Sequence, residues 1–175
     1  MAVLPVLSGE ASVRELAEVW GIVWIGNIAG ALGFSALIAV FAPQFGIADT
    51  GSFDEIATAL TDHTWWVVLV SAVLAGLLMG LLTWLVGAAK ETISAVVIII
   101  LVAGSIGFVG LHHSIAGSVE VLFGVFGGNV SLAAFLVFLL WATVGNAVGG
   151  SVFVAILKYA HVVRSEPEPD EEQSD

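Results

Sequence analysis

The sequence contains no cysteine and few residues with a positive charge. Among its 175 residues, Lys and Arg together number 4, Asp and Glu number 15, and the formal net charge is −11. The absence of cysteine excludes a disulfide scaffold, a thiolate metal site and a cysteine nucleophile. The scarcity of Lys and Arg argues against a nucleic-acid partner, because cations bind its phosphates. Charged residues are 11% of the chain, against roughly 25% in soluble domains, which excludes that class.

The sequence also lacks the motifs of enzyme chemistry. It has no phosphate-binding glycine loop, no pair of carboxylates in one polar pocket and no Ser-His-Asp arrangement with a soluble fold behind it. We therefore predict that the protein is not an enzyme, and we expect no catalytic residues, no metal site and no cofactor.

Hydrophobic residues make up 59% of the chain and gather in four long stretches. They run over Val19–Ala42, Trp65–Ala89, Ile93–Phe126 and Val130 to about Val163. A helix needs about 20 apolar residues to cross a bilayer, so each stretch is long enough. We predict an all-α, polytopic membrane protein with lipid around it. The six Trp residues are mostly expected near span ends, as interfacial anchors.

The few cations predict the orientation. Arg14 precedes the first stretch, Lys90 lies between the second and third, and Lys158 and Arg164 end the fourth. With four crossings they all fall on one side, which the positive-inside rule assigns to the cytoplasm together with both termini. The expected organisation is a cytoplasmic segment over 1–18, a transmembrane helical domain over 19–163 in the cell membrane and an acidic cytoplasmic tail over 164–175.

A polar segment, Pro43–Thr64, separates the first two stretches. Ser52 precedes Phe53, Asp54 and Glu55 and resembles a helix N-cap. We predict a short surface helix that begins after Ser52.

The third stretch is too long for one straight crossing. As a single helix, Ile93–Phe126 would measure roughly 50 Å, against a hydrocarbon core of about 30 Å. Small and polar residues interrupt it from Gly104 to Glu120. Non-helical backbone is tolerated at membrane depth only inside protein or beside a water-filled cavity. We therefore predict a broken helix that lines a cavity.

The first and fourth stretches contain the same sequence motif, Gly-Asn-x-x-Gly, called the Gly-Asn phrase below. The first contains Gly26-Asn27-Ile28-Ala29-Gly30 and the fourth contains Gly145-Asn146-Ala147-Val148-Gly149-Gly150. Small residues at this spacing let helices approach closely, whereas an amide in hydrocarbon needs partners. Because the first and fourth stretches run in opposite directions, the phrase indicates an inverted repeat with its functional site near mid-membrane.

His113 is the foremost candidate in the broken stretch. One interpretation is an ionisable residue that binds a substrate, and the other is a neutral imidazole that satisfies a freed backbone carbonyl. His112 is expected at a subunit contact or in a vestibule, since a metal site of two adjacent His residues is unfavourable. For Glu120, a subunit contact is favoured over a position in the path.

Together, the stretch Gly107-Phe108-Val109-Gly110-Leu111-His112-His113-Ser114-Ile115-Ala116 and the two Gly-Asn phrases resemble the formate/nitrite transporter family. The resemblance covers about Val19–Val163 as that family's third to sixth helices. It implies an aquaporin-like inverted-repeat fold, a homo-pentamer, and passage of small monovalent anions such as formate or nitrite. It also implies that His113, Asn27 and Asn146 line the path and that an apolar gate lies near Ile106 or Phe108. The corresponding hypothesis is that the imidazole of His113, flanked by the Asn amides, donates hydrogen bonds to an anion.

The chain departs from that pattern in three respects. The family's first two helices have no counterpart, Gly117 stands where Asn usually follows the His-Ser-Ile-Ala motif, and Ser8–Ser12 lacks the usual Lys. The alternative function is therefore a non-transporting membrane protein of the same fold that acts in assembly or interaction.

Overall fold

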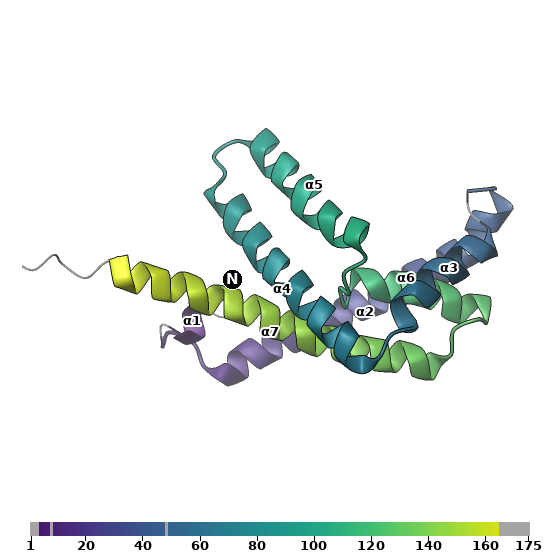
Figure 1. Ribbon diagram of the computed structural model, residues 1–175, viewed down its shortest axis with the longest axis horizontal. Helices are drawn as coiled ribbons and strands as arrows, with labels where there is room; N and C mark the ends of the chain where they lie inside the picture. Colours follow the sequence, from purple (N-terminus) through teal and green to yellow (C-terminus); the bar gives the residue numbers. More distant parts are fainter. Residues whose placement is uncertain (1–3, 8, 48, 165–175) are drawn as a thin grey trace, which may run out of the picture.

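In the computed structural model, which describes residues 4–7, 9–47 and 49–164, the regular structure is helical throughout (Figure 1). The helices are α1 (Leu4–Leu7), α2 (Val13–Gln44), α3 (Thr50–Thr61), α4 (Trp65–Ala88), α5 (Thr92–Val109), α6 (Ala116–Gly127) and α7 (Leu132–Arg164). Helices α2, α4, α5 and α7 each hold an apolar segment long enough to cross a membrane. The predicted polytopic helix bundle is confirmed, and so is the broken third span, whose halves are α5 and α6.

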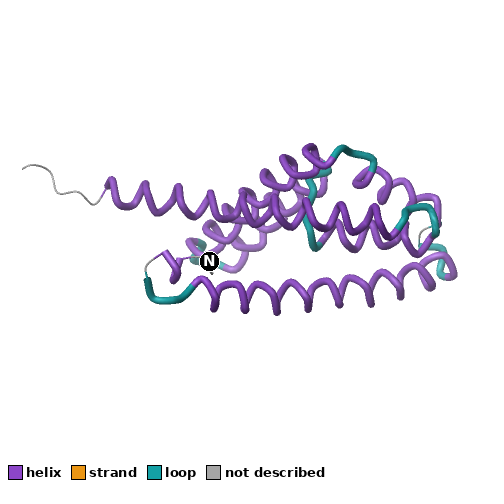
Figure 2. The backbone as a smooth tube through the Cα atoms, turned by 90° about the horizontal axis from the view of Figure 1, so that it is seen from below, coloured by secondary structure: helices purple, strands orange, loops and turns teal. Residues whose placement is uncertain are grey.

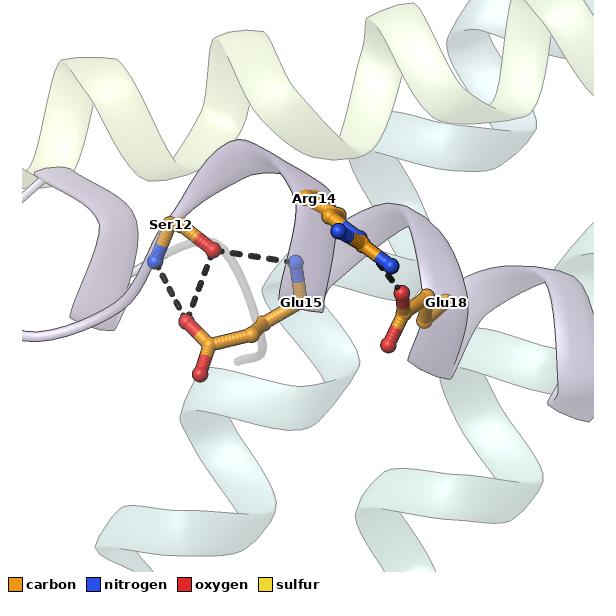
Figure 3. A network of polar contacts seen from close by, with 4 residues as sticks. All are labelled: Ser12, Arg14, Glu15 and Glu18. Atoms are coloured by element: carbon orange, nitrogen blue, oxygen red, sulfur yellow. Dashed lines mark hydrogen bonds and ion pairs between the residues drawn. The ribbon is translucent and has the colours of Figure 1, made fainter.

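Helix α2 begins before its apolar stretch because a polar cap starts it. The Ser12 hydroxyl accepts the Glu15 N–H at 3.2 Å, and the Glu15 carboxylate accepts the Ser12 N–H at 2.7 Å (Figure 3). Each side chain thus satisfies a backbone donor that the first helical turn leaves free. Arg14 and Glu18, one turn apart, form an ion pair at 2.9 Å. The acidic tail predicted at the other end of the chain lies, beyond Arg164, outside the described residues.

The helix predicted between the first two spans is present as α3, but its predicted N-cap is wrong. Asp49 caps it, and Ser52 lies inside the first turn, where its N–H donates to Asp49 Oδ1 at 2.8 Å. The Ser52 backbone and hydroxyl donors lower the pKa of the Asp49 carboxyl. The cap is therefore complete at neutral pH and is lost only as the pH falls through that lowered pKa.

Glycines bring α4 and α7 into close contact. A Cβ at Gly145 would lie 2.6 Å from the Leu69 carbonyl oxygen, and one at Gly149 would collide with the carbonyl oxygen of Val73. Only glycine permits this approach of two backbones. The main buried core continues from this contact into α3, α6 and the first half of α7.

The same phrase on α2 meets open space. A Cβ at Gly26 or Gly30 would find no heavy atom of the described chain within 4 Å. Helix α5 is also peripheral, since Ile106 is its one buried residue. Both helices therefore present apolar surface outward, as membrane helices do toward lipid or a neighbouring subunit.

We predict that a Gly→Ala substitution has opposite effects on the free energy of unfolding in the two copies of the phrase. Gly149→Ala should lower the free energy of unfolding by about 1–3 kcal/mol, because the added methyl overpacks the α4–α7 contact. Gly30→Ala should raise it by about 0.5 kcal/mol or leave it unchanged, because alanine favours helix and the methyl meets open space. Denaturant titration of both variants in lipid bicelles, followed by Trp fluorescence, measures the difference. Equal effects at the two positions would contradict the packing described here.

Candidate functional site

The broken span changes direction at a glycine. Gly110 ends α5 in the left-handed conformation, with φ of 72°, which glycine adopts without strain. The N–H of Leu111 returns to the Ile106 carbonyl at 2.9 Å. Residues 111–115 are then non-helical, and α6 begins at Ala116. The backbone groups of these residues lack helical partners and need others.

Asn146 of α7 supplies those partners. Its Oδ1 accepts the Ser114 N–H at 2.8 Å, and its Nδ2 donates to the His112 carbonyl at 3.1 Å and to the Ala72 carbonyl of α4 at 2.8 Å. One amide thus joins the break to α4 and α7. Both of its hydrogens are used, so it has none left for an anion. Asn146 therefore fixes the break, and its place beside an anion path stays a prediction.

His113 caps the second half of the span. Its Nδ1 accepts the backbone N–H groups of Ile115 and Ala116, each at 3.3 Å. Because Nδ1 is the acceptor, the proton of the neutral ring is on Nε2. Nε2 has no hydrogen-bond partner among the described residues, and the side chain lines a cavity.

That cavity has a volume of about 750 Å³ and lies between α2, α4, the break and α7. Helices α2 and α7 run along the long axis of the molecule in both views (Figure 1, Figure 2). The polar or aromatic residues that line it are Trp20, Trp24, Asn27, Thr83, His113, Ser114, Thr143, Asn146 and Ser151. From the break it extends toward the start of α2 and the ends of α4 and α7. No Lys, Arg, Asp or Glu is among the described residues that line it.

Three of the five predicted path residues meet at this cavity. His113, Asn27 and Asn146 all line it, although they come from the break, α2 and α7. Asn27 is exposed, and its Nδ2 donates to the Val23 carbonyl of its own helix at 2.7 Å. One amide hydrogen of Asn27 is therefore free to bind a ligand.

The other two predicted path residues lie away from the cavity. Ile106 is buried at the end of α5, whereas the Phe108 side chain is 94% exposed. Neither lines the cavity, because the chain turns at Gly110 and only the residues after the turn face α2 and α7.

Sequence reasoning missed several lining residues. Trp20 and Trp24, expected with the other Trp residues as interfacial anchors, line the cavity, and Trp24 Nε1 donates to Thr143 Oγ1 at 3.1 Å. The spacing of these residues at the helical period was the feature of the sequence that could have identified them. Trp20, Trp24 and Asn27 share one face of α2, and Thr143, Asn146, Gly150, Ser151 and Val154 share one face of α7.

His112 and Glu120 differ in how they are placed. The expectation of a subunit contact or vestibule position for His112 is wrong, since its side chain is 2% exposed and lies outside the cavity. Its hydrogen bonds hold it within the bundle. Glu120 is half-buried on α6 and has no hydrogen-bond or ion-pair partner in the described part of the chain.

An interrupted apolar helix beside a cavity that several polar side chains line is an arrangement of polytopic membrane proteins. Comparison with known proteins specifies the family. The model of the formate/nitrite transporter family matches residues 1–160. The chain belongs to that family.

Three relatives illustrate the similarity. The chain is 31% identical over 164 residues to "Inner membrane protein YfdC" of Escherichia coli (strain K12), covering 92% of this chain and 52% of the relative. It is 30% identical over 160 residues to "Uncharacterized transporter YrhG" of Bacillus subtilis (strain 168), covering 89% and 59%. It is 28% identical over 170 residues to "Probable formate transporter" of Methanothermobacter thermautotrophicus, covering 88% and 62%.

The chain thus spans between half and two thirds of the length of these relatives. No solved structure matches it significantly.

Proposed function

We propose that the chain is a subunit of a transmembrane path for small monovalent anions such as formate or nitrite. The observation that carries the proposal is the cavity beside the break, which His113 lines from the break and Asn27 lines from α2. The name of one relative, "Probable formate transporter", supports the substrate class.

The chemistry of the cavity suits an anion. Moving an unpaired ion from water to a low-dielectric interior costs several kcal/mol after relaxation. The His113 Nε2–H offers a hydrogen bond. A ring that takes a second proton on Nδ1, in place of the bonds from the Ile115 and Ala116 N–H groups, also offers a compensating charge. A weak-acid anion has a second route, in which it takes the proton from the ring and moves on as the neutral acid. None of the described residues that line the cavity is an Asp or Glu, so no negative charge there repels the anion.

The arrangement of the two Gly-Asn phrases supports an aquaporin-like inverted repeat. Asn27 and Asn146 face one cavity from helices that run in opposite directions. We also propose a homo-pentamer, whose subunit contacts would use apolar surface such as the outer face of α5. Its mass in detergent, measured by light scattering, tests that stoichiometry.

The test of the proposed function is anion flux in proteoliposomes. We expect saturable, pH-dependent entry of formate and nitrite above the rate of empty vesicles. Flux no greater than that of empty vesicles, from a sample with the expected helical circular dichroism, would overturn the proposal and favour the assembly or interaction protein.

The proposed orientation places both termini, the segment 1–18 and the tail 164–175 in the cytoplasm. Because the chain has no cysteine, single cysteines report it cleanly. In intact cells, a membrane-impermeant maleimide should label Thr58→Cys on α3 but not Glu91→Cys in the α4–α5 turn. Lysed cells should label both, which controls for accessibility. The reverse pattern in intact cells would invert the topology.

A further inference from the structure

His112 is bonded through each of its polar groups. Its backbone N–H donates to Ser71 Oγ at 3.0 Å, and its carbonyl accepts from Asn146 Nδ2 at 3.1 Å. Its ring nitrogens lie 2.8 Å from Ser71 Oγ and 3.1 Å from the Leu60 carbonyl oxygen. One residue of the break is thereby tied to α3, α4 and α7.

These contacts select one form of the ring. The Leu60 carbonyl can only accept, so Nε2 carries a hydrogen and donates to it. The Ser71 hydroxyl then donates to the free lone pair on Nδ1 while its oxygen accepts the His112 N–H. Every donor has an acceptor when the ring is neutral. A second ring proton would face the Ser71 oxygen and displace the hydroxyl hydrogen.

The Leu60 contact links the break to a helix that braces the second half of the span. Helix α3 packs against α6, and the two helices lie together at one end of the molecule (Figure 1). Phe53 stacks on Phe123 with ring centroids 4.6 Å apart, and Asp54 accepts a hydrogen bond from Asn129 just beyond the end of α6. His112 holds the end of α3 that lies beside the break.

We propose that His112 is a positioning residue for the anion site, which acts from outside the cavity as a neutral ring. By tying Leu60 and Ser71 to the break, it sets where His113 and Ser114 face the cavity. The inference rests on the proposed function, because it names what holds that site in place.

The test compares selectivity, which does not depend on how much protein folds. His112→Gln retains a donor that reaches toward the Leu60 carbonyl, but its acceptor, Oε1, does not lie at the position of Nδ1 beside Ser71. We expect the ratio of formate to acetate permeability to fall by about tenfold, within the hundredfold that a misplacement of about 1 Å can cost. His63→Gln is the matched control, since His63 is exposed and its ring meets that of His112 in a T-shaped contact, with centroids 5.5 Å apart.

A double-mutant cycle identifies the contact. Ser71→Ala should lower the permeability ratio more in the unaltered protein than in the His112→Gln background, because in that background the ring bond is already lost and only the backbone N–H of residue 112 still donates to Ser71 Oγ. Additive effects would mean that the two residues act separately. If the ratio of formate to acetate permeability were unchanged in His112→Gln, the proposal would be overturned.

Solid-state NMR of the same samples tests the positioning role of His112 without a flux measurement. The ¹⁵N shifts of the His112 ring should stay those of a neutral, Nε2-protonated ring between pH 8 and pH 5. The Ser114 and Ile115 amide resonances should move in His112→Gln and stay in place in His63→Gln. A His112 ring that titrates, or amides that do not move, would refute the inference. If the unaltered protein showed no anion flux, that result would refute the proposed function but not the structural role of His112.

Discussion

Formate flux through His113→Asn falls by about 100-fold, the loss expected when one preorganised donor facing a negative charge is removed. The asparagine Oδ1 takes the place of Nδ1 and still accepts from Ile115 and Ala116, so the cap on α6 persists. No group remains at the position of Nε2 to donate into the cavity. His113→Asn therefore separates the role of the ring as a cap from its role toward the anion.

The pH profile distinguishes the two roles further. Flux through the unaltered protein should rise toward the acid end of a scan from pH 8 to pH 5, where a second proton on Nδ1 displaces the Ile115 and Ala116 N–H groups. Both proposed routes predict this sign, because a protonated ring offers either a charge or a proton. His113→Asn should be flat over that range after subtraction of the flux through empty vesicles.

The matched comparison is His113→Phe, which removes the cap and the cavity donor together. We expect it to lose flux as His113→Asn does and, in addition, to unfold at lower denaturant concentration. If His113→Asn kept the rate and the pH profile of the unaltered protein, His113 would be a structural cap alone.

Asn146→Ala lowers the free energy of unfolding by about 3 kcal/mol, because the substitution leaves the Ser114 N–H and the His112 carbonyl without partners at a buried break. The corresponding substitution on the other copy of the phrase, Asn27→Ala, should cost less than about 1 kcal/mol. The bond of Asn27 is to a carbonyl on its own exposed helix face, where loss of a hydrogen bond exposes both partners to surroundings that can replace it.

Denaturant titration in bicelles measures both variants, with Trp fluorescence and helical circular dichroism as independent probes. Coincident transitions in the two signals establish that one unfolding step is compared. Equal losses for Asn146→Ala and Asn27→Ala would contradict the role given to the Asn146 bonds. Flux should fall in both variants, since both side chains line the cavity.

Much of the site was predictable from residue types. A histidine in a glycine-rich interruption and an asparagine in each of two apolar stretches are costly in a membrane, so each indicated a function or a partner. His113, Asn27 and Asn146 indeed meet at one cavity. Trp24 and Thr143 were missed because tryptophan and threonine are common in membrane helices, and only the helical period sets them apart.

Other predictions failed because neighbouring residues have different surroundings. His112 and His113 have the same side chain, yet one is buried against Leu60 and Ser71 and the other faces the cavity. Ser52 resembled an N-cap, but Asp49, three residues earlier, has the stronger acceptor and the extended backbone of a cap. The gate expected near Ile106 or Phe108 stays a prediction, since neither residue lines the cavity beside His113.

The sequence by itself determined the number of apolar spans, the interruption of the third and the residues that are costly in lipid. These follow from local rules, because hydrophobic length and the demand for backbone hydrogen bonds depend on each segment alone. Only the tertiary structure decided which polar groups are used and which stay free. Asn146 has its partners on residues 32, 34 and 74 positions away. Such pairings depend on how helices pack, which no local pattern records.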